Sequence, residues 1–294
     1  MNSTAAAVPQ SSVDLAGGLL FVFLWSTGYI AAVYGLDGSG PYTLAVVRFL
    51  GTATLIGAWV LVLRLRWPAL RATLQVGVAG ILLQGGFFGF AYAGMQAGCP
   101  PAVAGLICGL MPLTTALGAA VILGERMHRS AVVGLGLGLA GVLLVVGPGL
   151  VEPGTALGYG FMFLALTTLS LGTVFQKRQA GKLDARLALV IQVLAASLVM
   201  IPVAWWREGL QFTPTGATLG GMAWVILVNS CAGVLLYLWL LRRGAAGRVA
   251  SVFFLVPPVT AVLAAVMLGA RFDLIDAAGF GLAAAGVWLG QRTA

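Results

Sequence analysis

The chain has 294 residues, of which 60% are hydrophobic and only 8% are charged, and its mean hydropathy is +1.03. A soluble domain carries about a quarter charged residues, so these charges are too few to cover a water-facing surface. The net charge of +8 is spread over the connections between apolar stretches, which argues against a nucleic-acid-binding patch. The composition therefore indicates an integral membrane protein.

Ten apolar segments follow one another, each long enough to cross a hydrocarbon core of about 30 Å as a helix. Helix is required because an open strand would leave backbone groups unpaired in lipid. No lysine or arginine precedes Leu15, so we expect the first segment to be a retained helix and not a cleaved signal peptide. The segments are expected at residues 14–33, 42–63, 71–93, 101–123, 130–146, 156–177, 185–206, 218–241, 247–268 and 274–290.

The second half of the chain repeats the first at a distance of 145 residues. Residues 77–145 align without a gap with residues 222–290, so that Pro112 recurs as Pro257. Each half holds five segments, and an odd number of crossings turns the second half upside down. The predicted fold is an all-α integral membrane protein of ten transmembrane helices, built as two inverted five-helix repeats. Such repeats place a substrate site between the halves, near the bilayer midplane. The repeats are expected at residues 14–147 and 156–291.

Lysine and arginine in the connections predict the orientation, because positive loops stay in the cytoplasm. Every even-numbered connection is positive, whereas the odd ones hold only Arg207 and Arg271, each near acidic residues. Both termini are therefore expected in the cytoplasm. The positive residues of the even connections are Arg64, Arg66, Arg71, Arg126, Arg129, Lys177, Arg178, Lys182, Arg186, Arg242, Arg243 and Arg248.

Residues 105–126 read GLICGLMPLTTALGAAVILGER, with Pro112 inside the segment and a Leu-Gly-Glu-Arg end. This resembles the EamA-type repeat of the drug/metabolite transporter superfamily, and Trp25 and the Pro41 and Arg48 pair are similar to that family as well. Both halves share the resemblance, which is nearest to ten-helix bacterial amino-acid exporters of the YddG type. It implies a multi-pass protein of the bacterial inner membrane.

Gln84 and Asn229 are uncharged amides at equivalent positions of the two repeats, deep inside apolar segments. A polar group there must face a partner or a cavity, so we predict that both contact substrate. The alternative is hydrogen bonding between helices that only holds the bundle together. Tyr92 and Tyr237 lie two turns further along, although Tyr237 also fits an aromatic belt at the membrane interface.

Trp25 and Tyr29 lie one turn apart on the first segment, and Ser170 and Thr173 mark the sixth. The resemblance implies that these two helices line the central cavity, with close helix packing as the alternative. Aromatic side chains suit an apolar substrate but also face lipid. The predicted substrate-binding residues are Trp25, Tyr29, Gln84, Phe88, Tyr92, Ser170, Thr173, Asn229, Tyr237 and Phe253.

Pro112 and Pro257 should kink the fourth and ninth helices, because proline removes a helix hydrogen bond. They are predicted hinges, with a static kink as the alternative. Glu125 is a predicted gate residue, with capping of its helix as the alternative. Because Ala270 stands at the equivalent position of the second repeat, only the first repeat can use a carboxylate there. Arg48 can meet a substrate carboxylate or snorkel to the interface; otherwise helix dipoles would meet that carboxylate.

The predicted function is export of small metabolites, notably amino acids including aromatic ones, by alternating access. Exporters or permeases for drugs or nucleotide-sugars are alternatives. A membrane enzyme needs paired carboxylates, a histidine cluster or an activated nucleophile, and the segments offer none, so no catalytic residue, metal or cofactor is expected. No acidic residue lies mid-membrane, which argues against sodium or proton coupling through a buried carboxylate. The expected partners are a small molecule and the bilayer, with the protein acting as a monomer.

Overall fold

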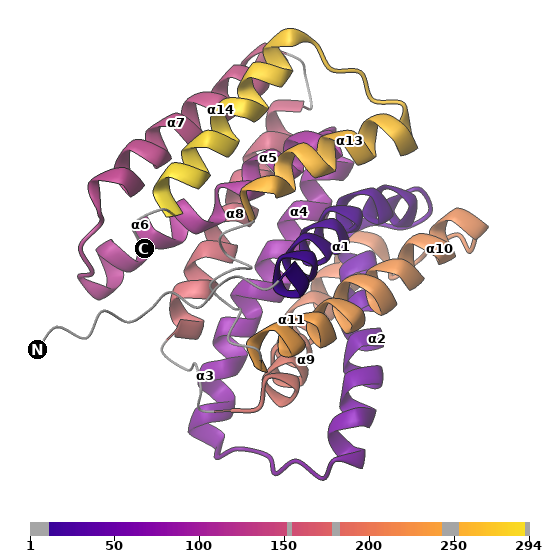
Figure 1. The fold of residues 1–294 in the computed structure, drawn as a ribbon. Coiled ribbons are helices and arrows are strands. Elements are labelled where there is room, and N and C mark those ends of the chain that lie inside the picture. Colours follow the sequence, from indigo (N-terminus) through magenta and orange to yellow (C-terminus); the bar gives the residue numbers. More distant parts are fainter. Residues whose placement is uncertain (1–11, 152–154, 178–182, 243–252, 292–294) are drawn as a thin grey trace, which may run out of the picture.

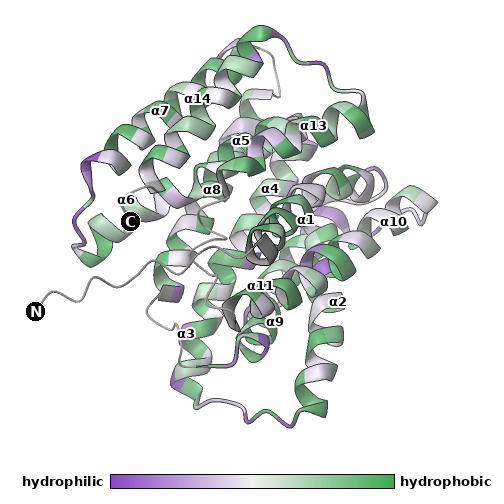
Figure 2. Cartoon of the chain, viewed as in Figure 1, coloured by the Kyte–Doolittle hydropathy of each residue, from purple (hydrophilic) through white to green (hydrophobic). Residues whose placement is uncertain are grey.

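The computed structural model describes residues 12–151, 155–177, 183–242 and 253–291. This part of the chain is helical, and its extended residues form a single isolated bridge, between Ser39 and Phe212. In Figure 2 hydrophobic residues run along the helices, and hydrophilic residues gather mainly in the connections between them. The local structure therefore follows the apolar segments of the sequence.

By length and composition, seven helical runs can cross a membrane, and three shorter apolar helices accompany them. Each of the ten expected segments overlaps one of these stretches, and residues 247–252 of the ninth lie outside the described residues. The longer runs are Leu15–Leu36, Pro41–Val62, Leu70–Gln96, Pro101–Leu123, Arg129–Val146, Thr155–Gln176 and Ala185–Glu208, and the shorter helices are Gly216–Ala232, Val256–Leu268 and Leu274–Gly290.

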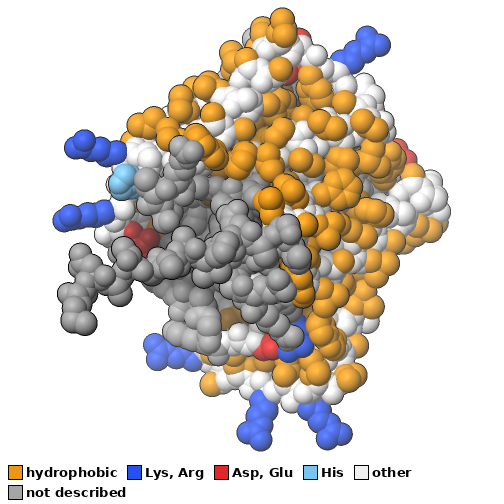
Figure 3. Space-filling model, viewed as in Figure 1, with side chains coloured by type: hydrophobic (Ala, Val, Ile, Leu, Met, Phe, Trp, Pro, Cys, Tyr) orange, Lys and Arg blue, Asp and Glu red, His pale blue; other side chains and the backbone are white. Residues whose placement is uncertain are grey.

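The surface of these helices is apolar. Leu61, Val121, Leu198 and Val266 are each more than three-quarters exposed, and Figure 3 shows a broad hydrophobic face with arginine and lysine side chains only at its edges. A water-soluble protein rarely exposes so continuous an apolar surface. The chain is therefore a multi-pass membrane protein.

The described elements of the two halves follow in a similar order, although no described helix of the second half corresponds to α5. The first half contains α1 (Ser12–Leu36), α2 (Pro41–Val62), α3 (Leu70–Gly80), η1 (Ile81–Gly86), α4 (Phe87–Gln96), α5 (Pro101–Gly109), α6 (Met111–Leu123) and α7 (Arg129–Val146), with η2 (Gly147–Val151) after it. The second half contains α8 (Thr155–Lys177), α9 (Ala185–Glu208), α10 (Gly216–Trp224), η3 (Val225–Ala232), α11 (Gly233–Arg242), η4 (Phe253–Leu255), α13 (Val256–Leu268) and α14 (Leu274–Gln291).

Helix ends follow from the residues placed there. Pro41 and Pro101 begin α2 and α5, where the missing N–H costs nothing. Gly124 and Gly269, equivalent in the two repeats, end α6 and α13 with φ of 71° and 68°. Glycine adopts this left-handed conformation without steric cost.

The third and eighth helical runs each contain a π-helical stretch. The segment η1 spans six residues and η3 spans eight. Gln84 lies in η1 and Asn229 in η3, so both predicted amides are on π-helical turns. Such bulges are rare and occur often at functional sites.

The fourth run breaks directly before its proline. The helix α5 ends at Gly109, and α6 begins at Met111 with Pro112 in its first turn. Pro257 has the same place in the first turn of α13. The two breaks face each other, because a Cβ added to Gly109 would lie 2.5 Å from Cγ of Pro257.

Equivalent helices of the two halves pair with each other. The glycines of α7 and α14 approach so closely that a Cβ on Gly141 would lie 2.5 Å from the carbonyl oxygen of Gly279, and Gly134 likewise meets Gly286. The residue number rises along α7 as it falls along α14, so this pair is antiparallel. Small residues permit such close approach.

The pair α2 and α9 is antiparallel too. The carboxylate of Glu208, at the end of α9, accepts hydrogen bonds from the backbone N–H groups of Tyr42 and Thr43 at the start of α2. At the opposite ends the Arg186 guanidinium lies 4.7 Å from the ring centroid of Trp59. The α2–α9 pair is thus tied at both ends.

In Figure 1 the pair α7 and α14 lies at the top of the view, and α2 and α9 lie near the bottom. Between them α1 packs against α10 and α13, and α8 packs against α4 and α6. The main hydrophobic core lies at their centre and includes the fully buried side chains of Leu106, Ile107 and Met162. First-half helices are therefore packed largely against second-half helices.

Candidate functional site

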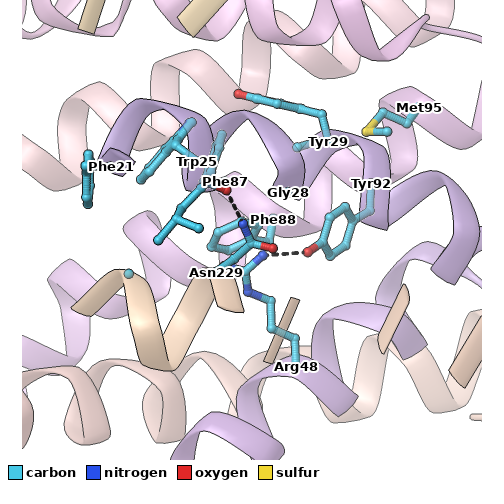
Figure 4. Close-up of a pocket in the computed structure, with 13 residues that line it drawn as sticks. Phe21, Trp25, Gly28, Tyr29, Arg48, Phe87, Phe88, Tyr92, Met95 and Asn229 are labelled. Atoms are coloured by element: carbon cyan, nitrogen blue, oxygen red, sulfur yellow. Dashed lines mark hydrogen bonds between the residues drawn. The ribbon is translucent and has the colours of Figure 1, made fainter. Parts of the chain in front are cut away.

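A pocket lies where α1, α2 and α4 meet η3 and α11. Figure 4 shows a lining that is mostly apolar and aromatic, with few polar groups. The lining residues are Phe21, Leu24, Trp25, Gly28, Tyr29, Arg48, Phe87, Phe88, Ala91, Tyr92, Met95, Asn229 and Gly233.

Arg48 is the one charged residue among the described residues that line the pocket, and it is only 7% exposed. Its Nε donates a hydrogen bond of 3.1 Å to the hydroxyl of Ser230, and its Nη1 donates one of 2.8 Å to the hydroxyl of Tyr92. The guanidinium carbon lies 3.8 Å from the ring centroid of Phe88, a contact that stabilises a desolvated cation by about 2 kcal/mol. Arg48 therefore stays inside the protein and does not snorkel to the interface.

No carboxylate pairs with Arg48 in the described part of the chain. A cation removed from water without an anionic partner costs several kcal/mol of folding free energy, by a rough estimate. The hydroxyl groups and the aromatic ring around Arg48 offset only part of this cost. The pocket therefore has a fixed positive charge that is open to an anion.

Asn229 lies beside this charge on the same pocket. Its Nδ2 donates a hydrogen bond of 2.5 Å to the carbonyl oxygen of Leu24 on α1. The absence of a side chain at Gly28 permits this close approach, because a Cβ there would lie 3.1 Å from Nδ2. Its Oδ1 is buried and has no hydrogen-bond partner in the described residues. An unsatisfied buried acceptor costs about 1–3 kcal/mol, which a ligand donor would recover.

Aromatic rings form one continuous wall of the pocket. The Trp25 ring lies 6.0 Å from that of Phe21 and 6.3 Å from that of Phe87, measured between centroids. Phe87 lies 4.6 Å from Phe88, which in turn lies 5.7 Å from Tyr92. Such rings provide apolar contact area for a ligand side chain.

Met95 separates this pocket from a second, wider hollow, because it lines both. The second hollow lies between the end of α1 and the connection that follows α4. Its other lining residues are Val33, Tyr34, Leu36, Asp37, Gln96, Gly98, Cys99, Pro100, Pro101 and Ala217.

Half of the predicted substrate-binding residues come together in this pocket: Trp25, Tyr29, Phe88, Tyr92 and Asn229. Their role in binding stays a prediction. The side chains of two others, Tyr237 and Phe253, lie outside the described residues.

Gln84, Ser170 and Thr173 do not line the pocket. The hydroxyl of Ser170 lies 2.6 Å from that of Thr114, a hydrogen bond that joins α8 to α6. Thr173 donates to the carbonyl oxygen of Leu169 in its own helix. In this conformation, then, Ser170 and Thr173 make contacts within the helix bundle.

The predicted hinge and gate residues lie away from the pocket. Pro112 and Pro257 are at the helix breaks described above, and Glu125 is exposed after α6. Nothing in their contacts assigns them a motion, so hinge and gate stay predictions.

Several lining residues were not predicted. Phe21 lies one turn before Trp25 on the same face of α1, a spacing that is visible in the sequence. Ser230 follows Asn229 on η3 and does not line the pocket itself, but its hydroxyl accepts a hydrogen bond from Arg48. Met95 is an ordinary apolar residue in sequence, and no pattern distinguishes it.

A helical body with many apolar spans and an internal pocket of mixed aromatic and polar character defines a multi-pass membrane protein with a candidate binding site. A family model described as "EamA-like transporter family" matches residues 14–147 and again residues 156–290. The chain belongs to the EamA-like transporter family, within the drug/metabolite transporter superfamily.

Named relatives agree with this class. The chain is 27% identical over 282 residues to the "Probable amino-acid metabolite efflux pump" of Salmonella typhimurium, covering 92% of each chain. It is 26% identical over 260 residues to the "Uncharacterized inner membrane transporter YedA" of Escherichia coli strain K12, covering 87% of this chain and 83% of the relative. A crystal structure of a protein with 23% identity shares the fold, with a TM-score of 0.67 over 96% of this chain and 98% of its own. The chain is thus a multi-pass inner membrane protein.

Proposed function

We propose that the protein carries small zwitterionic metabolites, amino acids above all, out of the cell through the pocket around Arg48. The observation that carries the proposal is this pocket, in which a buried cation and a free amide oxygen lie against an aromatic wall. An amino acid offers the matching carboxylate, ammonium and apolar side chain. The name of the Salmonella relative supports the same substrate class.

Alternating access would follow from inverted repeats. The antiparallel contacts of α7 with α14 and of α2 with α9 are those that two halves of opposite orientation make across a two-fold axis. We infer ten crossings in two such repeats, at 14–147 and 156–291. The proline breaks that meet at Gly109 and Pro257 would let one half rock against the other around the pocket.

The inferred orientation places both termini in the cytoplasm. It predicts that cysteines in even-numbered connections are labelled from the cytoplasmic side and those in odd-numbered connections from the outside. In a cysteine-free background, Arg64→Cys should react with an impermeant thiol reagent only in broken cells, because loops rich in arginine stay inside. Asp37→Cys should react in intact cells. Both positions are exposed and need no structural change to be labelled. Labelling of Arg64→Cys in intact cells would refute the orientation and the inversion of the halves.

A side chain that fills the pocket should stop transport without unfolding the protein. Gly233 lines the pocket, and a Cβ there would meet only the carbonyl oxygen of Val228, at 3.8 Å. We expect Gly233→Leu to lower counterflow of labelled phenylalanine in liposomes by at least about tenfold, a loss of roughly 1.4 kcal/mol in ligand or transition-state binding.

The matched control is Gly160→Leu on α8, since a Cβ there meets no atom within 4 Å and the position is exposed. It should transport like the wild type. Equal counterflow by both variants would place the substrate path elsewhere, and counterflow that requires sodium would contradict uncoupled export.

A further inference from the structure

We propose that Arg48 is a carboxylate anchor, and that the pocket selects organic monocarboxylates with an apolar, preferably aromatic, body. In this assignment the carboxylate is the required group and the ammonium of an amino acid is a secondary one. The inference rests on the proposed function only in that it concerns the same pocket. It extends the substrate class to monocarboxylates that lack an ammonium group, and it excludes lipophilic amines.

The first argument for a carboxylate anchor is that Arg48 has N–H donors without a partner in the described residues. A guanidinium has five N–H groups, and two of them are used, by Ser230 and Tyr92. The other three have no partner in the described residues. Because two parallel N–H groups match the two oxygens of a carboxylate, one carboxylate can satisfy donors that the protein leaves free.

The bonds already made fix the position of the guanidinium. Ser230, on η3, and Tyr92, on α4, accept hydrogen bonds from the guanidinium. The ring of Phe88, also on α4, packs against the face of the guanidinium. Figure 4 shows Arg48 extended toward Tyr92, with Phe88 beside it. Arg48 is on α2, and the contacts from η3 and α4 therefore hold its guanidinium in place. Preorganisation of this kind favours binding, because less freedom is lost when the ligand arrives.

The second polar determinant is Oδ1 of Asn229, a buried acceptor without a partner in the described residues. Carboxylate and ammonium are adjacent on an α-amino acid, and Arg48 and Asn229 line one pocket. An ammonium can donate to Oδ1, yet it also approaches a fixed cation. A ligand with an ammonium and no carboxylate gains one hydrogen bond and meets an unopposed like charge, so it should be rejected.

Three ligands with the same aromatic body test this assignment: L-phenylalanine, 3-phenylpropionate and 2-phenylethylamine. Binding to the purified full-length protein is measured in lipid nanodiscs by isothermal titration. The wild type should bind phenylalanine and phenylpropionate and should not bind phenylethylamine. Phenylethylamine bound as tightly as phenylalanine, or no binding of either carboxylate, would overturn the anchor without any variant.

Variants then assign the selectivity to Arg48. We expect Arg48→Gln to weaken binding of both carboxylates about 10- to 100-fold, the usual effect of losing a charge-assisted hydrogen bond. Arg48→Lys keeps the charge and loses the planar fork, so its affinities should fall in between. Asn229→Leu should weaken phenylalanine binding more than phenylpropionate binding, because only phenylalanine has an ammonium to donate to Oδ1. The matched control is Arg66→Gln, an exposed cation outside the pocket, which should bind like the wild type.

Counterflow in liposomes, measured on the same proteins, separates the two proposals. Arg48-dependent carboxylate binding without transport would contradict the carrier function and support the anchor. Transport of phenylalanine that is unaffected by Arg48→Gln would support the carrier function and overturn the anchor. If Arg48→Gln does not elute as a folded protein in size-exclusion chromatography, Arg48→Lys and the wild-type ligand panel decide the outcome.

Discussion

Replacing Gly141 with leucine should prevent α7 and α14 from pairing and leave little folded protein. A Cβ at Gly141 would lie 2.5 Å from the carbonyl oxygen of Gly279 and 2.6 Å from the backbone nitrogen of Ala283. Both neighbours are backbone atoms of a packed helix, so they cannot move aside as a side chain would. Overpacking costs typically about 1–3 kcal/mol, and we expect at least the upper value here. The measurement is the melting temperature and the yield of monodisperse protein in detergent.

The control for this prediction lies on the same helix. Gly136 is exposed, and a Cβ there meets no atom within 4 Å. Gly136→Leu makes the same chemical change toward lipid and should melt like the wild type. Gly286→Leu, at the position equivalent to Gly141, should behave like Gly141→Leu because its Cβ would lie 2.5 Å from the carbonyl oxygen of Gly134. Equal melting of Gly141→Leu and Gly136→Leu would show that the α7–α14 contact does not hold the halves together.

Much of the helical organisation could be predicted, because single residues fix it locally. An apolar run must be helical in lipid, proline at Pro112 interrupts it, and glycine at Gly124 ends it. The family could be predicted from the same residues, and the family model confirms it. The transporter class follows from the family, whereas the substrate and the number of crossings stay proposals.

The sequence could not predict which side chains of each helix face the pocket. Residues were placed on faces by counting 3.6 per turn, and a π-helical stretch changes that count. The segment η3 is two residues longer than η1, so Asn229 and Gln84 do not have the same surroundings. Gly28 on α1 faces Asn229, whereas Gly172 on α8 faces Leu83. The sequence repeat alone suggested a symmetric pair, and the structure brings only Asn229 to the pocket.

Arg48 could be recognised in the sequence, but its role could not be chosen. Snorkelling and ligand binding both fit one cation near the end of an apolar segment. The choice depends on Ser230 and Tyr92, which lie 182 and 44 residues away in sequence. A local sequence pattern cannot predict contacts between residues that are so far apart in the chain.

Removing the carboxylate of Glu208 should destabilise the protein by about 2 kcal/mol, a typical value for hydrogen bonds to a charged group. Its oxygens accept from the backbone of Tyr42 over 3.0 Å and of Thr43 over 2.7 Å, and from the Thr43 hydroxyl over 2.6 Å. Gly40, the residue before α2, makes no side-chain cap, so Glu208 caps α2 from the other half of the chain. It also opposes the positive end of the helix dipole. We expect Glu208→Ala to lower the melting temperature in detergent.

A second variant tests the same contact from α2. A Cβ on Gly40 would collide with the carboxylate of Glu208, so Gly40→Ala should lower the melting temperature as Glu208→Ala does. In the double variant the two effects should not add, because each removes the same cap. Asp37→Asn, an exposed carboxylate at the end of α1, is the control and should melt like the wild type. If the contact between α2 and α9 stays closed throughout the transport cycle, transport per folded molecule is the same in Glu208→Ala and the wild type. A changed turnover would instead show that this contact opens during the cycle.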